Sequence, residues 1–219
     1  MINFETIKND ENIKTYIREA DASLAALGYT EHSFVHVGTV SYNAAYLLSE
    51  IGASDHEVEL ARIAGYMHDI GNIVNRVDHS QSGALIAFRI LDKMQMPAAD
   101  IAKIVTAIGN HDEGTGIPVS AIAAAIILAD KADVRRSRVR NTDSLTFDIH
   151  DRVNYSVTDS SLTVSSDKRA VTLSLVIDTK ISSIMDYFEI FLGRMKLCRT
   201  AAEKLGMSFK LRINEQEFI

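Results

Sequence analysis

Hydrophobic residues recur every three to four positions through the first 140 residues, which is the spacing of one buried helix face. A first stripe runs from Ile13 to Leu27, and Gly28 stands where such a helix would end. Ser54 and Glu57 have the spacing of a capping box that opens another helix. The stripes predict helices that begin near residues 13, 30, 54, 78, 97 and 120. The last of these is expected to continue through Asp130 into the basic run Arg135–Arg140.

The pattern changes after about residue 150, where hydrophobic and polar residues alternate in short segments. Strands are predicted near 153–157, 162–164 and 171–177, followed by a helix over 184–205 and a last strand over 207–214. The fold class is therefore mainly α, an all-helical bundle with a small C-terminal β-β-β-α-β unit. We expect a helical domain over 1–150 and an appended unit over 151–219. That unit is expected to pack on the helical domain or on a second subunit.

Composition narrows the classes of function. The 219 residues are 47% hydrophobic, enough for one sizeable core. A net charge of −6 argues against a partner that is a nucleic-acid polymer or an anionic membrane. Cys198 stands alone, so a disulfide framework is excluded, and the apolar run 121–129 is too short to span a bilayer. The polar start indicates no signal peptide. We expect a cytoplasmic protein, and the exposed strand edges allow a homodimer.

Two carboxylates fall where the pattern predicts burial. His68-Asp69 ends an apolar helix, and adjacent helical residues point about 100° apart, so both reach one ion only if the helix ends there. Gly71 makes such an ending plausible. Asp130 follows a long apolar stretch, and a buried carboxylate must be paired, hydrogen-bonded or metal-bound. An ion pair with Lys131 and a metal site both remain open for Asp130.

The other histidines are ambiguous when they are taken singly. His36 suits a core residue as well as a ligand, and His79 suits a helix cap. His111 lies in a polar, glycine-rich loop, and His56 in the capping box is expected to be solvated. The third His-Asp pair, at 150–151, begins the predicted strand region, and we interpret it as structural.

Taken in order, His36, His68-Asp69 and Asp130 match the H…HD…D pattern, and the chain resembles the HD superfamily of metal-dependent phosphohydrolases. The resemblance covers roughly residues 25–140 and implies the all-helical fold of that superfamily. With His79 added, and His111 after it, the pattern is similar to the six-ligand form found in HD-GYP phosphodiesterases, which usually holds two metals bridged by the Asp of HD.

The chain departs from the HD-GYP signature at three places. It has Asn72 where those proteins have Lys, Asn110-His111 where they have His-His, and Gly116-Ile117-Pro118 where they have Gly-Tyr-Pro. The resemblance therefore implies hydrolysis of a phosphomonoester or phosphodiester, a nucleotide-like small molecule, without specifying a cyclic dinucleotide.

The resemblance also implies roles for individual residues. The expected metal ligands are His36, His68, Asp69, His79, His111 and Asp130, and the expected cofactor is two divalent ions of Mn, Fe, Co, Ni or Zn. His68, Asp69 and Asn72 are the expected catalytic residues. Lys131 and Arg135, on one predicted helix face with Arg138, are expected to bind the substrate phosphate. His32 and Asp112 are expected to be additional ligands or to orient a ligand imidazole.

Two other classes of function remain open. The same six ligands also serve di-iron oxygenases of the superfamily, which consume O₂ where a hydrolase would not. The second alternative is a non-catalytic, metal-binding regulatory module.

Overall fold

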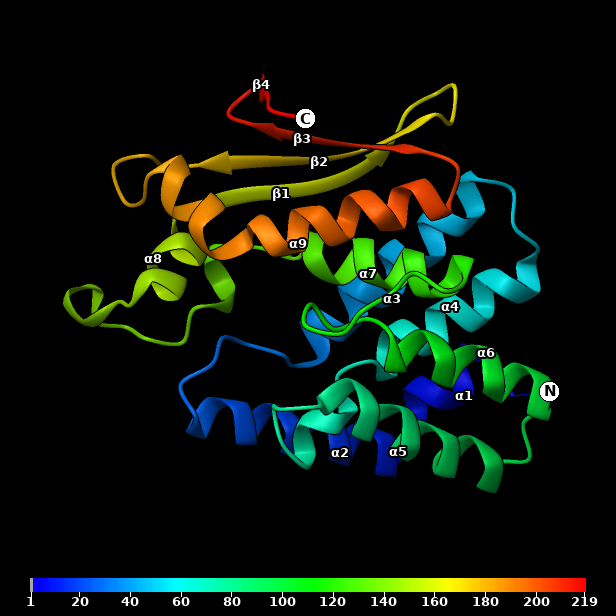
Figure 1. Ribbon diagram of the computed structural model, residues 1–219. Coiled ribbons are helices and arrows are strands. Elements are labelled where there is room, and N and C mark those ends of the chain that lie inside the picture. The colour runs from blue at the N-terminus through cyan, green and yellow to red at the C-terminus, as the bar shows by residue number, and fades with distance from the viewer. Residues whose placement is uncertain (1) are drawn as a thin grey trace.

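The structure is a computed structural model that describes residues 2–219, and helices make up most of it (Figure 1). The α-helices are α1 (Phe4–Asn9), α2 (Glu11–Ala26), α3 (Phe34–Glu50), α4 (Asp55–Met67), α5 (His79–Lys93), α6 (Ala98–Gly109), α7 (Ala121–Ala132), α8 (Ile149–Ser156) and α9 (Ile184–Lys204). Short 3₁₀ helices are η1 (Ile70–Ile73), η2 (Arg136–Arg138) and η3 (Ser144–Thr146). A small sheet contains β1 (Val157–Val164), β2 (Ala170–Ile177), β3 (Ser208–Ile213) and β4 (Gln216–Glu217).

Local sequence signals set most of the helix ends. The predicted capping box of α4 is present, with both reciprocal bonds between Ser54 and Glu57. Ser120 caps α7 by accepting a hydrogen bond from the Ala123 backbone. Gly28 follows α2 with a φ of +83°, a conformation that glycine adopts without strain. The third helix begins at Phe34 rather than near residue 30, because Ser33 is its cap.

The sheet has the order β1-β2-β3-β4. β1 and β2 are antiparallel, β2 and β3 are parallel, and β3 and β4 form a short antiparallel pair. The crossover between the two parallel strands is α9, which lies below the sheet in Figure 1 and packs against α7, while β1 also contacts α7. The C-terminal unit thus combines strands with a helix, as the sequence predicts. Its elements follow the order α8-β1-β2-α9-β3-β4, which differs from the predicted β-β-β-α-β.

The predicted first strand, 153–157, is wrong, because residues up to Ser156 form α8. Asp148 caps this helix by accepting from the Asp151 backbone, and Val153 and Ser156 are buried on one side of it. Three alternating residues are too short a pattern to distinguish a strand from one helical face.

Helix α7 contacts α3, α4, α6 and α9, and this enclosure explains why it is apolar on all sides. The prediction that it continues into the basic run is wrong, because it ends at Ala132. Ser160 of β1 donates to the Ala132 carbonyl oxygen, and the buried Arg138 donates to the Asp133 carbonyl oxygen. The predicted helix face shared by Lys131, Arg135 and Arg138 is therefore also wrong.

The helical part and the sheet share one continuous core. Ile127 of α7, Phe191 of α9 and Leu211 of β3 belong to the same cluster of buried side chains. The predicted boundary at residue 150 stays a prediction, since this core crosses it. Among residues 2–219, the helices are all too short or too polar to cross a membrane.

Gly71 lies where η1 meets the start of α5, and this close approach leaves no room for a side chain. A Cβ there would collide with the His79 carbonyl oxygen and the Gly83 nitrogen, whereas a Cβ at Gly38 in α3 would meet nothing within 4 Å. We expect Gly71→Ala to lower the free energy of unfolding by about 1–3 kcal/mol through overpacking. The control Gly38→Ala should raise it by about 0.5–1 kcal/mol, because alanine favours helix interiors. Urea unfolding in EDTA measures both, and equal stability of Gly71→Ala and wild type would contradict the packing.

Candidate metal centre

Six titratable side chains from five separate segments converge beside the start of α3, since His68 and Asp69 are neighbours in the chain. All six residues lie at or near a helix end. Five of them are no more than 5% exposed, and Asp130 is somewhat more exposed. The residues are His36 in α3, His68 after α4, Asp69 before η1, His79 at the start of α5, His111 after α6 and Asp130 in the last turn of α7. The structure therefore brings together all six residues that the sequence singles out as ligands.

Asp69 lies between the histidines because α4 ends at Met67 and the chain enters η1. This confirms the prediction that the helix ends at His68-Asp69. Asn72, the third residue of η1, donates two hydrogen bonds from Nδ2, to the backbone oxygen and to Oδ1 of Asp69, each 2.9 Å long. Asn72 thus holds the Asp69 carboxylate, and the side-chain Oδ1 of Asn72 accepts a hydrogen bond from Arg76 Nη1.

A first group of donor atoms surrounds Asp69 Oδ2. The Nε2 atoms of His36 and His68 are 3.3 Å apart, and each lies within 3.4 Å of this carboxylate oxygen. Asp130 Oδ1 is 3.4 Å from His36 Nε2 and 3.7 Å from His68 Nε2. Two imidazole nitrogens and two carboxylate oxygens therefore face one point.

A second group surrounds the other oxygen of the same carboxylate. The Nε2 atoms of His79 and His111 are 3.2 Å apart, and they lie 3.4 and 3.9 Å from Asp69 Oδ1. Asp112 Oδ1 is 3.8 Å from His79 Nε2 at the edge of this group. Donor atoms of His68, Asp69 and His111 also lie within 4.8 Å of one another, so the two groups adjoin.

Hydrogen bonds on the far side of the rings fix which nitrogen faces these groups. In each ring Nδ1 donates to an oxygen, so in the neutral imidazole Nε2 carries the lone pair. The acceptors are the carbonyl oxygens of Gly65 for His68 (2.8 Å), Arg76 for His79 (3.0 Å) and Ile108 for His111 (2.6 Å), and the carboxylate of Asp133 for His36 (2.7 Å). The four lone pairs consequently point at one another across the two groups.

This arrangement fits divalent metal ions. Lone pairs 3.2–3.3 Å apart repel unless a proton or a cation lies between them. Ligand atoms at about 2.1 Å from one ion are about 3.0–3.4 Å from each other, which matches most of these separations. Imidazole with carboxylate is a donor set for Mn, Fe, Co, Ni or Zn.

The two groups differ in their electrostatics. Burial lowers the pKa of His68, but Asp69 and Asp130 outweigh it and raise that pKa to about 10. Burial also lowers the pKa of His36, but hydrogen bonds that its imidazole donates to the carboxylates of Asp130 and Asp133 outweigh burial and raise that pKa. Burial dominates at His79 and His111 and lowers the pKa of both imidazoles. The first group, with more carboxylates, therefore attracts positive charge more strongly.

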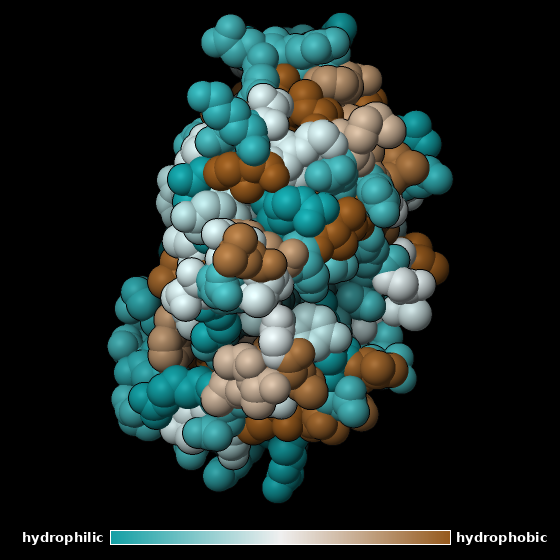
Figure 2. Space-filling model, turned by 90° about the vertical axis from the view of Figure 1, so that its left-hand side faces the viewer, coloured by the Kyte–Doolittle hydropathy of each residue, from teal (hydrophilic) through white to brown (hydrophobic). Residues whose placement is uncertain are grey.

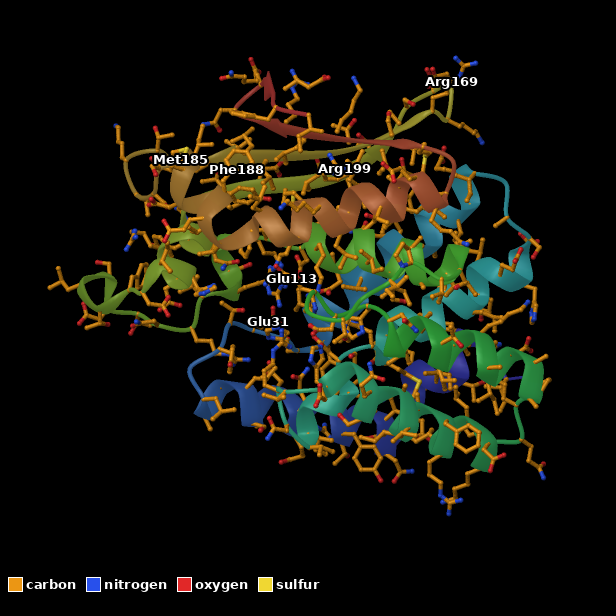
Figure 3. The ribbon with its side chains drawn as sticks, viewed as in Figure 1. Glu31, Glu113, Arg169, Met185, Phe188 and Arg199 are labelled. Atoms are coloured by element: carbon orange, nitrogen blue, oxygen red, sulfur yellow. The ribbon has the colours of Figure 1, made fainter. Side chains whose placement is uncertain are left out.

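A cleft of about 520 Å³ opens beside this cluster and is lined by Asp69, His79 and Asp130. Lys131, expected to bind phosphate, also lines it, and its Nζ donates to Asp130 Oδ2 at 2.7 Å. Arg135 does not belong to the lining. Its guanidinium donates to Asp133 and to Glu31, which Figure 3 labels between α9 and the lower helices.

The remaining predicted residues surround the cluster. His32 lines the cleft with its ring centroid 5.2 Å from that of His36, and its Nδ1 donates to the Thr30 carbonyl oxygen. Burial holds the pKa of His32 well below its ordinary value. His56 pairs with Asp100 at the surface, away from the cluster. The third His-Asp pair lies on α8 and lines the cleft, which the sequence did not indicate.

Several residues around the site were not anticipated. Asp133 holds the His36 ring, and its position three residues after Asp130 was the available signal. Arg76 and Arg194 line the cleft, together with Arg138 of the basic run that the sequence had indicated. Arg194 comes from α9 and pairs with Glu113 of the His111 loop, and no local pattern connects those two segments.

Asp133→Asn tests whether the hydrogen bond to Nδ1 orients His36. The uncharged asparagine forms a weaker hydrogen bond with Nδ1–H and so fixes the tautomer of His36 less firmly. Removal of such a partner typically lowers metal affinity about 10–100-fold. The control Asp100→Asn alters a similar His–Asp contact, of 2.8 Å, at the surface and should leave the affinity unchanged. Competition with a chelating dye measures the dissociation constant, and equal values for both variants would contradict the role of Asp133.

Comparison with known proteins identifies the family. The model of the HD domain matches residues 34–148, more than half of the chain, and that range contains all six converging residues. Uncharacterized protein MJ1020 of Methanocaldococcus jannaschii is 26% identical over 163 residues, which are 64% of this chain. The match covers 62% of that relative, so the chain spans less than two thirds of it. The family match and the converging His and Asp side chains agree, and the chain belongs to the HD domain family, whose members are generally metal-dependent hydrolases.

Proposed function

We propose that the protein is a metal-dependent phosphohydrolase that acts on a small phosphomonoester or phosphodiester. The observation that carries this proposal is the sharing of one buried carboxylate, Asp69, between two pairs of imidazole nitrogens. His36, His68, Asp69 and Asp130 would hold one ion, and Asp69, His79 and His111 a second. Bound divalent ions supply a water of lowered pKa and neutralise charge on a phosphoryl group.

The cationic side chains of the cleft support an anionic substrate, although the carboxylates of Asp69, Asp130, Asp148 and Asp151 also line it. Four cationic side chains line it beside the ligand cluster, namely Arg76, Lys131, Arg138 and Arg194. Guanidinium groups bind phosphate oxygens through paired N–H donors, and ammonium groups bind them as point charges. Arg138 is 5% exposed and Lys131 is 5% exposed, so both act where water screens charge weakly.

The chain's own residues would divide the work of the reaction. Asn72 holds the Asp69 carboxylate, and the hydrogen bonds from the Nδ1 atoms to backbone carbonyl oxygens hold the imidazoles. The ligand atoms would therefore stay in place while charge develops on the phosphoryl group. Lys131 and Arg138 would orient the phosphoryl group. Asp112 is half-buried and its Oδ1 lies 3.8 Å from His79 Nε2, so it would bind the second ion or orient the His79 imidazole.

Asp69→Ala tests the function, since it removes the carboxylate common to both groups. Wild-type protein loaded anaerobically with Mn²⁺ should release phosphate or alcohol from at least one member of a broad phosphoester panel. Asp69→Ala should lose more than about a hundredfold in kcat/KM, beyond the usual cost of losing only an outer partner of a ligand. The surface control Asp100→Ala should retain full activity.

The same assay separates the rival functions. Turnover that requires O₂ and iron would contradict the hydrolase and favour an oxygenase with the same ligands. A metal-loaded wild type that cleaves nothing in the panel would favour a regulatory module.

A further inference from the structure

One wall of the cleft comes from outside the residues that match the HD domain. Helix α8 begins at Ile149, directly after the matched range, and it contributes His150, Asp151 and Asn154 to the lining. Figure 2 views the molecule from the side on which α8 lies in Figure 1. Hydrophilic residues on this face are interspersed with small patches of hydrophobic residues. The part of a ligand that extends away from the metal centre would meet this helix.

Asn154 is the most enclosed polar group of this wall. It is 7% exposed, and its Nδ2 donates to the His150 carbonyl oxygen at 2.8 Å. Within residues 2–219 its Oδ1 accepts no hydrogen bond, and this atom is not sealed from the cleft. Because Oδ1 is accessible and has no donor from the protein, it is available to a donor that a ligand supplies.

The neighbouring groups of α8 are also acceptors. Asp151 is half-buried, and its Oδ2 accepts from Asn141, which leaves the other carboxylate oxygen for a further donor. An ionised carboxylate accepts hydrogen bonds and donates none. Asn154 and Asp151 therefore offer acceptors to hydroxyl or amino hydrogens of a ligand, beside the imidazole of His150.

Arg138 provides a hydrogen-bond donor in the same cleft. Its Nε donates to the Glu31 carbonyl oxygen and its Nη1 to the Asp133 carbonyl oxygen. Among the described residues Nη2 has no acceptor, although the residue is 5% exposed and lines the cleft. A ligand must therefore offer an acceptor to Arg138 and a donor to Asn154.

We propose that α8 selects the alcohol portion of the substrate, with Asn154 as a specificity-determining residue for phosphate esters that carry hydroxyl groups, as sugar phosphates do. This inference rests on the proposed phosphohydrolase function. A sphere with the volume of the cleft would be about 10 Å across, which exceeds a phosphoryl group and leaves room for a hydroxylated alcohol. Phosphate oxygens meet the cations, and hydroxyl hydrogens meet Asn154 and Asp151.

The test compares ribose 5-phosphate with phenyl phosphate, whose alcohol portion bears no free hydroxyl. Wild type should prefer ribose 5-phosphate, and Asn154→Leu, which keeps the side-chain shape, should reduce the ratio of the two kcat/KM values at least tenfold. The matched control is Asn9→Leu. Asn9 makes the same bond from Nδ2 to the carbonyl oxygen four residues earlier, but it lies on α1 outside this cleft. The control should keep the wild-type ratio, and melting temperatures establish that both variants fold.

Binding is measured separately, by the thermal shift that ribose 5-phosphate produces compared with inorganic phosphate. A larger shift with ribose 5-phosphate in wild type, and its loss in Asn154→Leu, supports the inference whether or not turnover occurs. Equal shifts in wild type, or an unchanged selectivity ratio in folded Asn154→Leu, would overturn it. Absence of turnover on both esters and on the broad panel overturns only the proposed hydrolase function.

Discussion

The metal centre depends on hydrogen bonds at the outer side of its imidazole rings. His68, His79 and His111 each donate Nδ1–H to the backbone carbonyl oxygen three residues earlier. The residues before each histidine belong to a helix end or a turn, where such carbonyls lack the usual helical partner. One bond thus satisfies a buried backbone group and directs an Nε2 lone pair into the centre. His36 lies inside a helix and has no such carbonyl, so Asp133 provides the acceptor.

The same constraint explains the overall arrangement. A cluster of ligands at helix ends requires several helices to end at one place, which the shared core around α7 enforces. The C-terminal unit contributes to this packing, because α9 covers α7 and Arg194 of α9 holds Glu113 of the His111 loop. Figure 3 labels Glu113 beside α9. The C-terminal unit therefore supports the site, and Phe191 and Arg194 of α9 also line the cleft.

Periodicity predicted most of the long helices, because helical stripes and helix caps are local signals, whereas the six converging residues followed from the resemblance to the HD superfamily. The end of α7 was not predictable in this way, since it depends on distant contacts of Ser160 and Arg138. The assignment of 153–157 as a strand failed because three alternating residues also fit one side of α8. Arg135 has a suitable charge for a phosphate ligand, but Glu31, 104 residues earlier, holds its guanidinium instead. Residue type alone did not show that pairing.

The metal content of the purified protein tests the central claim, that Asp69 joins two ligand groups, most directly. Protein reconstituted anaerobically with Mn²⁺ and freed of excess metal should contain two ions per chain by elemental analysis. His79→Ala should retain one ion, because the group with His36 and two carboxylates stays intact. A wild type that binds one ion, with no change in His79→Ala, would contradict the shared carboxylate.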